Sequence, residues 1–445
     1  MPSMRSALTV AAGRAARRLA RLRGGGRGGS AFPGLVVERI DPGFLARTLE
    51  GLPLGVVVVS GTNGKTTTTK ILVELLRSQG LRVFTNPTGS NFVRGVAAAL
   101  LTEVDARGRL AADIAVLELD EAHAVHFVRQ VRPRASLLLN VMRDQLDRFG
   151  EIDHTADLLH TVAKASTELV VLNGDDPRLS APRFTDDLGA RVERFGIGEG
   201  LRRVFLSDDD LRREDAGGAM LEDAGLGAGP ADGARTPATR LEAIDGRRAR
   251  ILVDGEEHEV EFVLPGVHNM LNATGALALA SSLLGADADL PALLRALAHV
   301  RAAFGRGEML EVDGVPLELA LVKNPAGFRM SLLSAGTDPA ETMIAINDEY
   351  ADGRDMSWLW DVDFSALRAS GVHVVSGVRA YDMALRLRYD EVLVDGVETD
   401  LGPALRSLID AARASGRPMR IFCTYTAMLA VRAQLSRITH VETVL

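Results

Sequence analysis

Cysteine is almost absent from this chain of 445 residues, since Cys423 is the only one. One thiol supports neither a disulfide framework nor a cysteine metal cluster, so a disulfide-stabilised secreted domain is excluded. No apolar run approaches the length that a membrane-spanning helix needs. We therefore expect a protein of the reducing cytoplasm.

Lysine is also scarce, with four residues in an arginine-rich chain: Lys65, Lys70, Lys164 and Lys323. Where arginine fills most basic positions, a retained lysine indicates a need for a compact point charge. Lys65 and Lys323 lie in the motifs described below. Lys70 and Lys164 are interpreted as solvated helix positions.

Positive charge does not prevail over the whole chain, because the formal net charge is −8. This balance argues against general nucleic-acid binding.

Aromatic residues make up only 4% of the chain, but hydrophobic residues make up 47%. A large core of Ala, Val and Leu can therefore form, and the length suffices for two or three domains.

Residues 1–50 are predicted to form a basic N-terminal arm. Its arginines, from Arg5 to Arg23, are interleaved with Ala and Leu, and a glycine-rich stretch follows at 24–29. A signal peptide fits poorly because the segment lacks an uninterrupted apolar core. Two interpretations stay open: a helix that lies on an anionic membrane, or, as we prefer, a solvated helix that packs against its own domain.

A glycine loop between a strand and a helix is the most informative motif. The β-branched run 56–59 predicts a buried strand, and residues 70–76 predict a helix. Such a loop offers backbone N–H groups and a helix N-terminus to a polyphosphate. Lys65 would reach the terminal phosphates and the Thr66 hydroxyl would hold Mg²⁺, in a loop that we expect to be open to solvent. The predicted ATP-binding residues here are Gly61, Thr62, Asn63, Gly64, Lys65, Thr66 and Thr67.

Alternating strand and helix patterns from residue 54 to about 180 predict a parallel sheet with helices on both faces. Further strands are expected at 114–117, 136–140 and 169–173. Glu118 follows the second strand, at the sheet edge where ligands bind, and is placed to hold Mg²⁺ with Thr66. The expected class is α/β.

The chain is expected to divide after the central ATP-binding domain, which we place at 51–305. Within it, residues from about 200 to 255 are rich in Gly, Ala, Asp and Arg and predict an irregular insertion. Strand-like alternation returns at 250–264, and a strong helix is expected at 269–284. Residues 306–445 predict a smaller Rossmann-like α/β domain, with strands near Ile344, Val372 and Ile421.

The loop Gly61–Thr67, GTNGKTT, is shorter than the common Walker pattern and resembles the Mur ligase superfamily of ATP-dependent amide-bond synthetases. This resemblance implies that Asn269 and Asn272 contact adenine. It implies that Arg306, at the domain junction, donates to the γ-phosphate. Lys323 matches the superfamily's C-terminal lysine, which approaches the ATP phosphates and the acyl phosphate.

Whether the chain has a second metal site stays open. Asn140 and residues 144–148 resemble a Mur ligase motif in which a histidine helps to bind metal, but Gln145 stands at that position. Where the usual central-domain ligases carry a carbamylated lysine, alignment by spacing places His160.

Residues 347–361 combine five carboxylates with both tryptophans of the chain. Together with 322–327 and 143–151, they closely resemble one subfamily, the Mur-ligase-like synthase subunit of lipid II isoglutaminyl synthase. The resemblance implies a heterodimer with a class I-like glutaminase subunit. The pair amidates the D-glutamate α-carboxyl of the lipid II stem peptide at the inner membrane face, using ATP and glutamine. Asp352 or Asp355 would complete the partner's Cys-His-Asp triad.

Many members of that subfamily carry a four-cysteine zinc ribbon, which one cysteine cannot form, so no zinc is expected. Two rival functions are compatible with the ATP-binding motifs. An amino-acid-adding ligase of the muramyl-peptide or folylpolyglutamate type is disfavoured because Leu321 replaces an acidic residue of those enzymes. A nucleotide-binding scaffold subunit is disfavoured by the intact Lys65, Thr66, Glu118 and Lys323.

Overall fold

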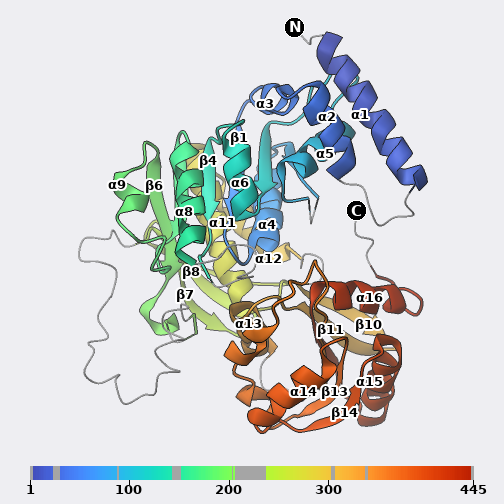
Figure 1. Ribbon diagram of the computed structural model, residues 1–445. Helices are drawn as coiled ribbons and strands as arrows, with labels where there is room; N and C mark the ends of the chain where they lie inside the picture. The colour runs from blue at the N-terminus through green and yellow to red at the C-terminus, as the bar shows by residue number, and fades with distance from the viewer. Residues whose placement is uncertain are drawn as a thin grey trace.

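The chain folds around two β-sheets, each covered by helices on both faces (Figure 1). The computed structural model describes residues 4–23, 31–87, 90–142, 152–202, 204–205, 237–301, 306–335 and 339–441. The first sheet is built from residues 56–261 and the second from residues 306–423. The expected α/β class is thereby confirmed, whereas the boundary predicted at 305/306 stays a prediction because residues 302–305 lie outside the described residues.

The first sheet has nine strands in the order β2-β3-β1-β4-β5-β6-β7-β8-β9. Pairing is parallel from β2 through β7 and antiparallel among β7, β8 and β9. Strands β1, β3, β4 and β5 are buried along their whole length, as expected where helices cover both faces. The strands are β1 (Val56–Ser60), β2 (Val83–Thr85), β3 (Ile114–Glu118), β4 (Ala135–Leu138), β5 (Leu169–Asn173), β6 (Arg191–Ile197), β7 (Thr239–Asp245), β8 (Arg248–Val253) and β9 (Glu256–Glu261).

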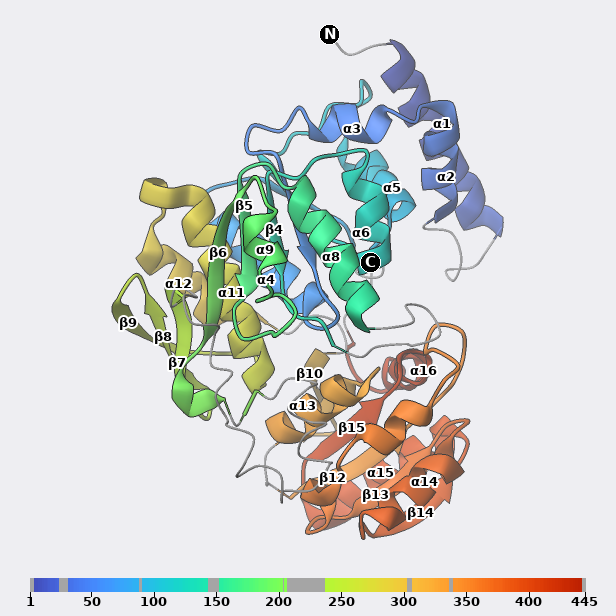
Figure 2. The same ribbon diagram turned by 60° about the vertical axis from the view of Figure 1, so that its left-hand side comes forward.

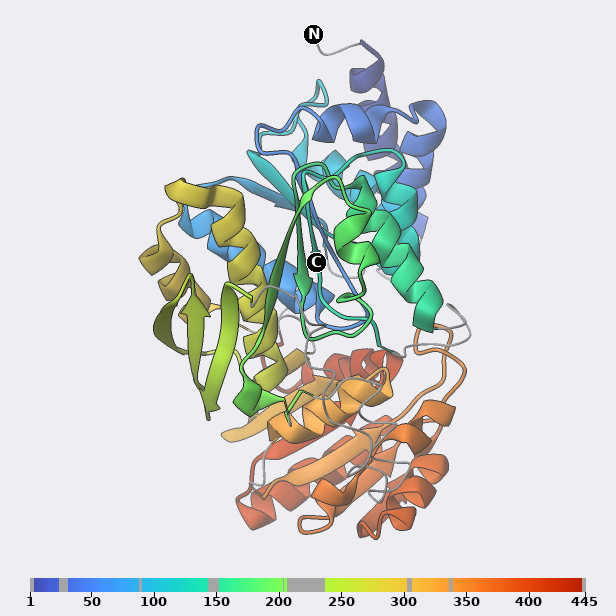
Figure 3. The same cartoon turned by 90° about the vertical axis from the view of Figure 1, so that its left-hand side faces the viewer.

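Two hydrophobic clusters lie on opposite faces of this sheet, and Figures 2 and 3 show the helices that form them. One face is covered by α4 (Lys65–Ser78), α11 (Val267–Leu284) and α12 (Leu290–His299). The other is covered by α5 (Val93–Glu103), α6 (Glu121–Val128), α8 (Ile152–Ala165) and the short α9 (Arg183–Asp186). Short 3₁₀ turns lie at η1 (Glu199–Leu201) and η3 (Gly285–Asp287).

The N-terminal helices extend the second of these clusters rather than forming a free arm. They are α1 (Met4–Arg23), α2 (Ala31–Ile40) and α3 (Phe44–Leu49). Val10, Val37 and Phe44 are buried in the same cluster as Leu100 of α5. Arg14 donates hydrogen bonds to the carbonyls of Leu101 and Val104, which lie at the end of α5. The inner face of α1 therefore packs against its own domain, as the preferred interpretation expects, and its opposite face stays exposed. None of the helices that the structure describes is long and apolar enough to cross a membrane.

The irregular insertion expected at 200–255 is wrong for residues 239–249, most of which form β7 and the start of β8, whereas the strand pattern expected from residue 250 corresponds to the rest of β8 and to β9. Aspartate and glycine supply tight turns here: Gly246 lies between the two strands, and Asp254 and Gly255 follow β8, all with positive φ. Within residues 239–255, the Asp and Gly residues that indicated a loop thus belong to hairpin turns between amphipathic strands. Residues 206–236 of the predicted insertion lie outside the described residues.

The second sheet has six strands in the order β10-β11-β15-β12-β13-β14, parallel except for the antiparallel β10–β11 hairpin. Its core has one cluster against α15 and α16 and another against α13, α14 and two 3₁₀ turns. The strands are β10 (Arg306–Val312), β11 (Val315–Leu321), β12 (Glu341–Ala345), β13 (Val372–Ser376), β14 (Val394–Glu398) and β15 (Met419–Cys423). The helices and turns are α13 (Pro325–Ala335), η4 (Ser357–Asp361), η5 (Ser365–Leu367), α14 (Ala380–Tyr389), α15 (Leu401–Ser415) and α16 (Tyr425–Leu435).

Candidate functional site

The loop between β1 and α4 has a conformation that requires glycine at two positions. Gly61 has φ 136° and Gly64 has φ 86°, values that L-residues rarely adopt. A Cβ at Gly64 would also lie 2.5 Å from Asn272 Oδ1, so α11 packs directly against the loop. The N-terminus of α4 follows at Lys65, and its first N–H groups have no partner within the helix. This arrangement fits an anion at the loop.

Lys65 is buried rather than open to solvent, which corrects the expectation for this loop. Only 7% of the residue is exposed. Its Nζ donates to Gly61 O at 2.5 Å and lies 3.1 Å from Glu121 Oε2, in a buried ion pair. Glu121 begins α6, so the lysine joins the loop to a second helix. The pair holds the ammonium group beside the glycine loop.

Thr66 and Glu118 meet as the sequence predicted. The Thr66 hydroxyl donates to Glu118 Oε1 at 2.8 Å, and both residues are buried. The Asn86 side chain fixes the end of β3, because it exchanges hydrogen bonds with the backbone N–H and C=O of Glu118. A hydroxyl and a carboxylate oxygen are donors that Mg²⁺ prefers, so the pair fits that ion.

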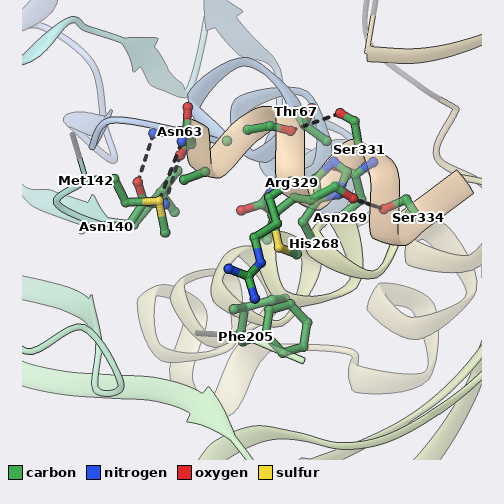
Figure 4. Close-up of a pocket in the computed structure, with 18 of the residues that line it drawn as sticks. Asn63, Thr67, Asn140, Met142, Phe205, His268, Asn269, Arg329, Ser331 and Ser334 are labelled. Atoms are coloured by element: carbon green, nitrogen blue, oxygen red, sulfur yellow. Dashed lines mark hydrogen bonds between the residues drawn. The ribbon is translucent and has the colours of Figure 1, made fainter. Parts of the chain in front are cut away.

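Asn140, at the end of the third predicted strand, positions the loop through both ends of its amide. Its Oδ1 accepts from the Asn63 backbone N–H at 2.8 Å, and its Nδ2 donates to Asn63 O at 3.1 Å (Figure 4). The Thr62 hydroxyl exchanges hydrogen bonds with the backbone of Met142. The loop conformation therefore depends on the neighbouring strand β4 as well as on its own glycines.

The second domain closes over the same loop. Lys323 Nζ donates to Thr62 O at 3.1 Å, as expected for a lysine that approaches the phosphate site. Asn324, which is fully buried, exchanges side-chain hydrogen bonds with Asn63 at 3.0 and 3.3 Å. Asn324 Oδ1 also accepts from Gly327 N at 2.8 Å, near the start of α13. Sequence reasoning assigned no role to Asn324, although its place directly after Lys323 was a signal.

A pocket between the two domains adjoins the loop, and both predicted adenine-contacting residues line it. Asn269 donates from Nδ2 to Pro265 O at 2.6 Å, while its buried Oδ1 has no hydrogen-bond partner among the described residues. A buried carbonyl oxygen without a partner is costly, so a donor from a ligand would stabilise it. Asn272 lies one turn further along α11 and faces Gly64.

Several residues that line this pocket were not predicted from the sequence to have a functional role. Figure 4 shows Arg329 extending from α13 toward the ring of Phe205, and His268 beside Ser334. His268 Nδ1 lies 3.2 Å from Ser334 Oγ. These side chains come from segments far apart in the sequence, so no local motif could indicate that they meet.

Two aspartates that follow β5, Asp175 and Asp176, line the pocket, and the pKa of each is raised. Burial raises the pKa of Asp175, and the Ile197 N–H that donates to it opposes this effect. Burial also raises the pKa of Asp176 to about 6, against backbone N–H donors that include Val141. Both groups therefore hold protons more readily than free aspartate.

Asp352 and Asp355 occupy different environments. Asp352 is 3% exposed, and its carboxylate accepts from Thr426 N at 2.7 Å, from the Thr426 hydroxyl and from Glu349 N. Burial raises its pKa. Asp355 is exposed, and hydrogen bonds from Ser357 lower its pKa. Asp352 thus joins its loop to the start of α16, whereas the Asp355 carboxylate is accessible and ionised at neutral pH.

The remaining predicted residues lie apart from the pocket or outside the described residues. His160 hydrogen-bonds Arg183 O at 3.1 Å and packs on Phe184, so α9 accounts for it. The Arg306 side chain and residues 144–148 lie outside the described residues, so the second metal site stays open. In the part of the chain that the structure describes, no group of three or more His, Cys, Asp or Glu residues has metal-site geometry.

Elemental analysis of the untagged protein is expected to find well under one zinc per chain. Cys423 is fully buried in the hydrophobic cluster between the second sheet and helices α15 and α16. Burial raises the pKa of its thiol and so disfavours the thiolate, which is the form that zinc binds. A buffer blank and a known zinc protein of similar mass serve as controls. Stoichiometric zinc that resists chelation would contradict this prediction.

Family comparisons cover most of the chain. The Mur ligase middle domain family matches residues 59–280, and the MurT ligase C-terminal family matches residues 321–428. The first match spans the glycine loop and most of α11, and the second spans Lys323, Asp352 and Asp355.

Similar proteins cover nearly the full length. The chain is 32% identical over 427 residues to the lipid II isoglutaminyl synthase (glutamine-hydrolyzing) subunit MurT of Streptococcus pneumoniae, covering 92% of each chain. It is 26% identical over 426 residues to the same subunit of Staphylococcus aureus, covering 93% of this chain and 94% of the relative. Among solved structures, MurF ligase of Thermotoga maritima in complex with ADP has a similar fold, with a TM-score of 0.66 and 18% identity over 91% of this chain and 84% of that one.

Proposed function

The chain belongs to the Mur ligase family, with a C-terminal domain of the MurT type, and on this premise we propose that it amidates the stem peptide of lipid II. The proposed reaction converts the D-glutamate α-carboxyl to the amide of D-isoglutamine and consumes ATP. Ammonia comes from a glutaminase subunit, with which the chain forms a heterodimer. The relatives' name, a glutamine-hydrolyzing synthase subunit, supports both the reaction and the need for a partner.

One observation carries the proposal: the phosphate loop of the first domain is held directly by the second domain. Lys65 and the Thr66–Glu118 pair come from the first domain, and Lys323 and Asn324 reach the loop from the second. Phosphoryl transfer depends on positioned positive charge around the transferring group. A scaffold subunit that bound nucleotide without turnover would not need two lysines converging on this loop.

The residues present fit ATP and Mg²⁺. Thr66 and Glu118 would hold the ion, and Lys65 and Lys323 would offset phosphate charge. Asn269 Oδ1, which has no hydrogen-bond partner in the described part of the chain, suits the exocyclic amine of adenine.

The chemistry requires two steps on the substrate carboxyl. A carboxylate oxygen first bonds to the terminal phosphorus of ATP, the P–O bond to ADP breaks, and an acyl phosphate results. Ammonia nitrogen then bonds to the carbonyl carbon, the C–O bond to phosphate breaks, and a proton leaves the nitrogen. Contact between the domains over the loop would exclude water, which otherwise hydrolyses the acyl phosphate.

The nitrogen must come from outside this chain. Its only cysteine, Cys423, is fully buried at the end of β15, so it cannot attack glutamine from solvent. Asp355 suits the role of triad acid for a partner, because it is exposed and its pKa is lowered. The hydrogen bonds of Asp352 are directed to its own chain, which favours Asp355 between the two candidates.

The amino-acid-adding rival keeps the same ATP site. It differs at Leu321, which lines the pocket with an apolar side chain where those enzymes carry an acid. Ammonia, unlike an amino acid, presents no carboxylate and no side chain for an enzyme to recognise. A pocket wall without that acid is therefore consistent with ammonia as the nucleophile.

The direct test is amidation by the purified complex of this chain with its glutaminase subunit. We expect ATP, Mg²⁺, glutamine and lipid II to yield a product in which one carboxyl has become an amide, detected by mass spectrometry after enzymatic release of the stem peptide. Omitting ATP should abolish the product, and ammonium should replace glutamine. Ligation of a free amino acid instead would identify the rival activity.

A further inference from the structure

Helix α1 presents an apolar strip on the face turned away from the domain. Thr9, Val10 and Ala16 are buried against the domain on the opposite side of the helix. A helix packed on its own domain normally exposes polar residues on its outer face. On α1 the outer strip instead consists of the exposed residues Leu8, Ala11, Ala15, Arg18 and Leu19, spaced mostly at three and four residues, and Arg5 is also exposed.

The two leucines of this strip are among the more exposed apolar side chains of the protein. Leu8 is 65% exposed and Leu19 is 56% exposed, about three turns apart on α1. Neither contributes to the core beneath, which Val10 and Val37 supply. What distinguishes them from single exposed leucines elsewhere is that Ala11 and Ala15 lie between them on the same face, so the apolar surface is continuous.

Positive charge flanks the strip. Seven arginines and no acidic residue precede Glu38, in a chain whose net charge is −8. Arg14 is used internally, since it bonds the carbonyls of Leu101 and Val104, whereas Arg18 is exposed within the strip. Arg5 bridges to Asp41, but 60% of its side chain remains exposed. Six of the seven arginines lie on α1, so positive charge is concentrated on this helix.

We propose that the outer face of α1 is a docking surface for an anionic membrane. An apolar strip bordered by arginines fits the boundary between acyl chains and acidic headgroups, where leucines enter the apolar region and guanidinium groups meet phosphates. A protein partner of matching charge would need an acidic, apolar groove, whereas a bilayer supplies both properties everywhere. The proposal rests on the proposed function in one respect: a lipid-linked substrate lies on such a surface.

The fold keeps this surface rigid. Hydrogen bonds of Arg14 to α5, and the Thr9 hydroxyl 3.4 Å from Asp41 Oδ2, fix α1 on the domain. A docked α1 would therefore hold the central domain, with its phosphate loop, in one orientation relative to the membrane. Substrate would then be met by diffusion in two dimensions.

Vesicle flotation of the purified complex tests the surface without any substrate. We expect binding to vesicles of phosphatidylglycerol, weak binding to vesicles of phosphatidylcholine, and a fall in binding as salt rises. The double variant Leu8→Gln/Leu19→Gln should lower partitioning roughly tenfold or more, because two leucines no longer leave water. The matched control is Leu393→Gln, a leucine 75% exposed on the second domain, which should bind as the wild type does.

Three results would overturn the proposal. They are wild-type complex that does not float with anionic vesicles, a double variant that floats equally well, and a wild-type dimer without vesicles that the double variant breaks. The last would make a second copy of this chain the occupant of the strip. A thermal unfolding scan checks that both variants fold, as expected for exposed positions.

Amidation assays separate this proposal from the proposed function. The double variant should amidate lipid II in detergent micelles at the wild-type rate, but lipid II in anionic vesicles roughly tenfold more slowly. Absence of amidation by the wild type in micelles would contradict the proposed function and leave the flotation result standing. Equal rates for both proteins in vesicles would show that the strip does not serve catalysis.

Discussion

Replacing Lys65 by methionine is expected to lower ATP-dependent amidation by on the order of 10²–10³-fold, the usual cost of losing one positioned charge-stabilising group. The same change should lower the free energy of unfolding by about 3–5 kcal/mol, because it leaves Glu121 buried without its cation. Both partners are nearly inaccessible, with side chains 8% and 3% exposed, so water cannot replace the ammonium group. Phosphate release and thermal unfolding of the same preparation measure the two effects.

A second substitution separates the two effects. Glu121→Gln in the Lys65→Met background removes the unpaired carboxylate, so most of the lost stability should return while activity stays low. Lys70→Met, one turn further along α4, is the matched control and should change neither quantity greatly. Full turnover by a folded Lys65→Met variant would remove Lys65 from the phosphate site. If Glu121→Gln restored both stability and activity to the Lys65→Met variant, the role of Lys65 would be purely structural.

Buried parallel strands could be located from the sequence because both of their faces are covered. The run 56–59 corresponds to β1, the predicted strand 169–173 is β5, and the predicted helix 269–284 lies within α11. In such strands nearly every residue is apolar, so the pattern is legible without knowing the neighbours. Thr66 and Glu118 also followed from sequence, since parallel strands bring their carboxyl ends to one edge.

Features that depend on contacts between distant segments could not be predicted in this way. The burial of Lys65 depends on Glu121, which is 56 positions away, and the closure of the loop depends on Asn324, which is 261 positions from Asn63. Strands β7 and β8 belong to the antiparallel end of the sheet, where alternate residues such as Leu241 and Ile251 pack on the core and the others are polar, so their composition resembled that of a loop. The outer face of α1 could be identified only once its inner face was known.

The nitrogen source distinguishes the two candidate acids of the segment 347–361. Asp355→Asn is expected to lower glutamine-driven amidation by about 10⁴-fold, the usual cost of losing a triad acid, and to leave ammonium-driven amidation near the wild-type rate. Its exposed carboxylate can reach a partner's histidine, and its lowered pKa keeps it anionic at neutral pH. High ammonium bypasses the glutaminase, so only a role in the partner's triad gives this split.

Asp352→Asn should behave differently, because its carboxylate serves its own chain. It accepts from Thr426 N, from the Thr426 hydroxyl and from Glu349 N, and asparagine retains only one acceptor oxygen. We expect the free energy of unfolding to fall by about 1–3 kcal/mol, the cost of a buried polar group left unsatisfied. Both activities should then decline together as the loop loses its attachment to α16.

Asp361→Asn, which alters another exposed carboxylate of this segment, is the matched control and should keep both activities. The three variants are compared in the purified complex with glutamine and with saturating ammonium, and each is checked for partner binding by size-exclusion chromatography. If Asp355→Asn lost both activities while remaining folded and bound, that acid would belong to the acyl-phosphate site of this chain. If Asp352→Asn alone lost the glutamine-driven reaction, the assignment of the triad acid by exposure would be wrong, because a carboxylate saturated by its own chain would then be reaching the partner.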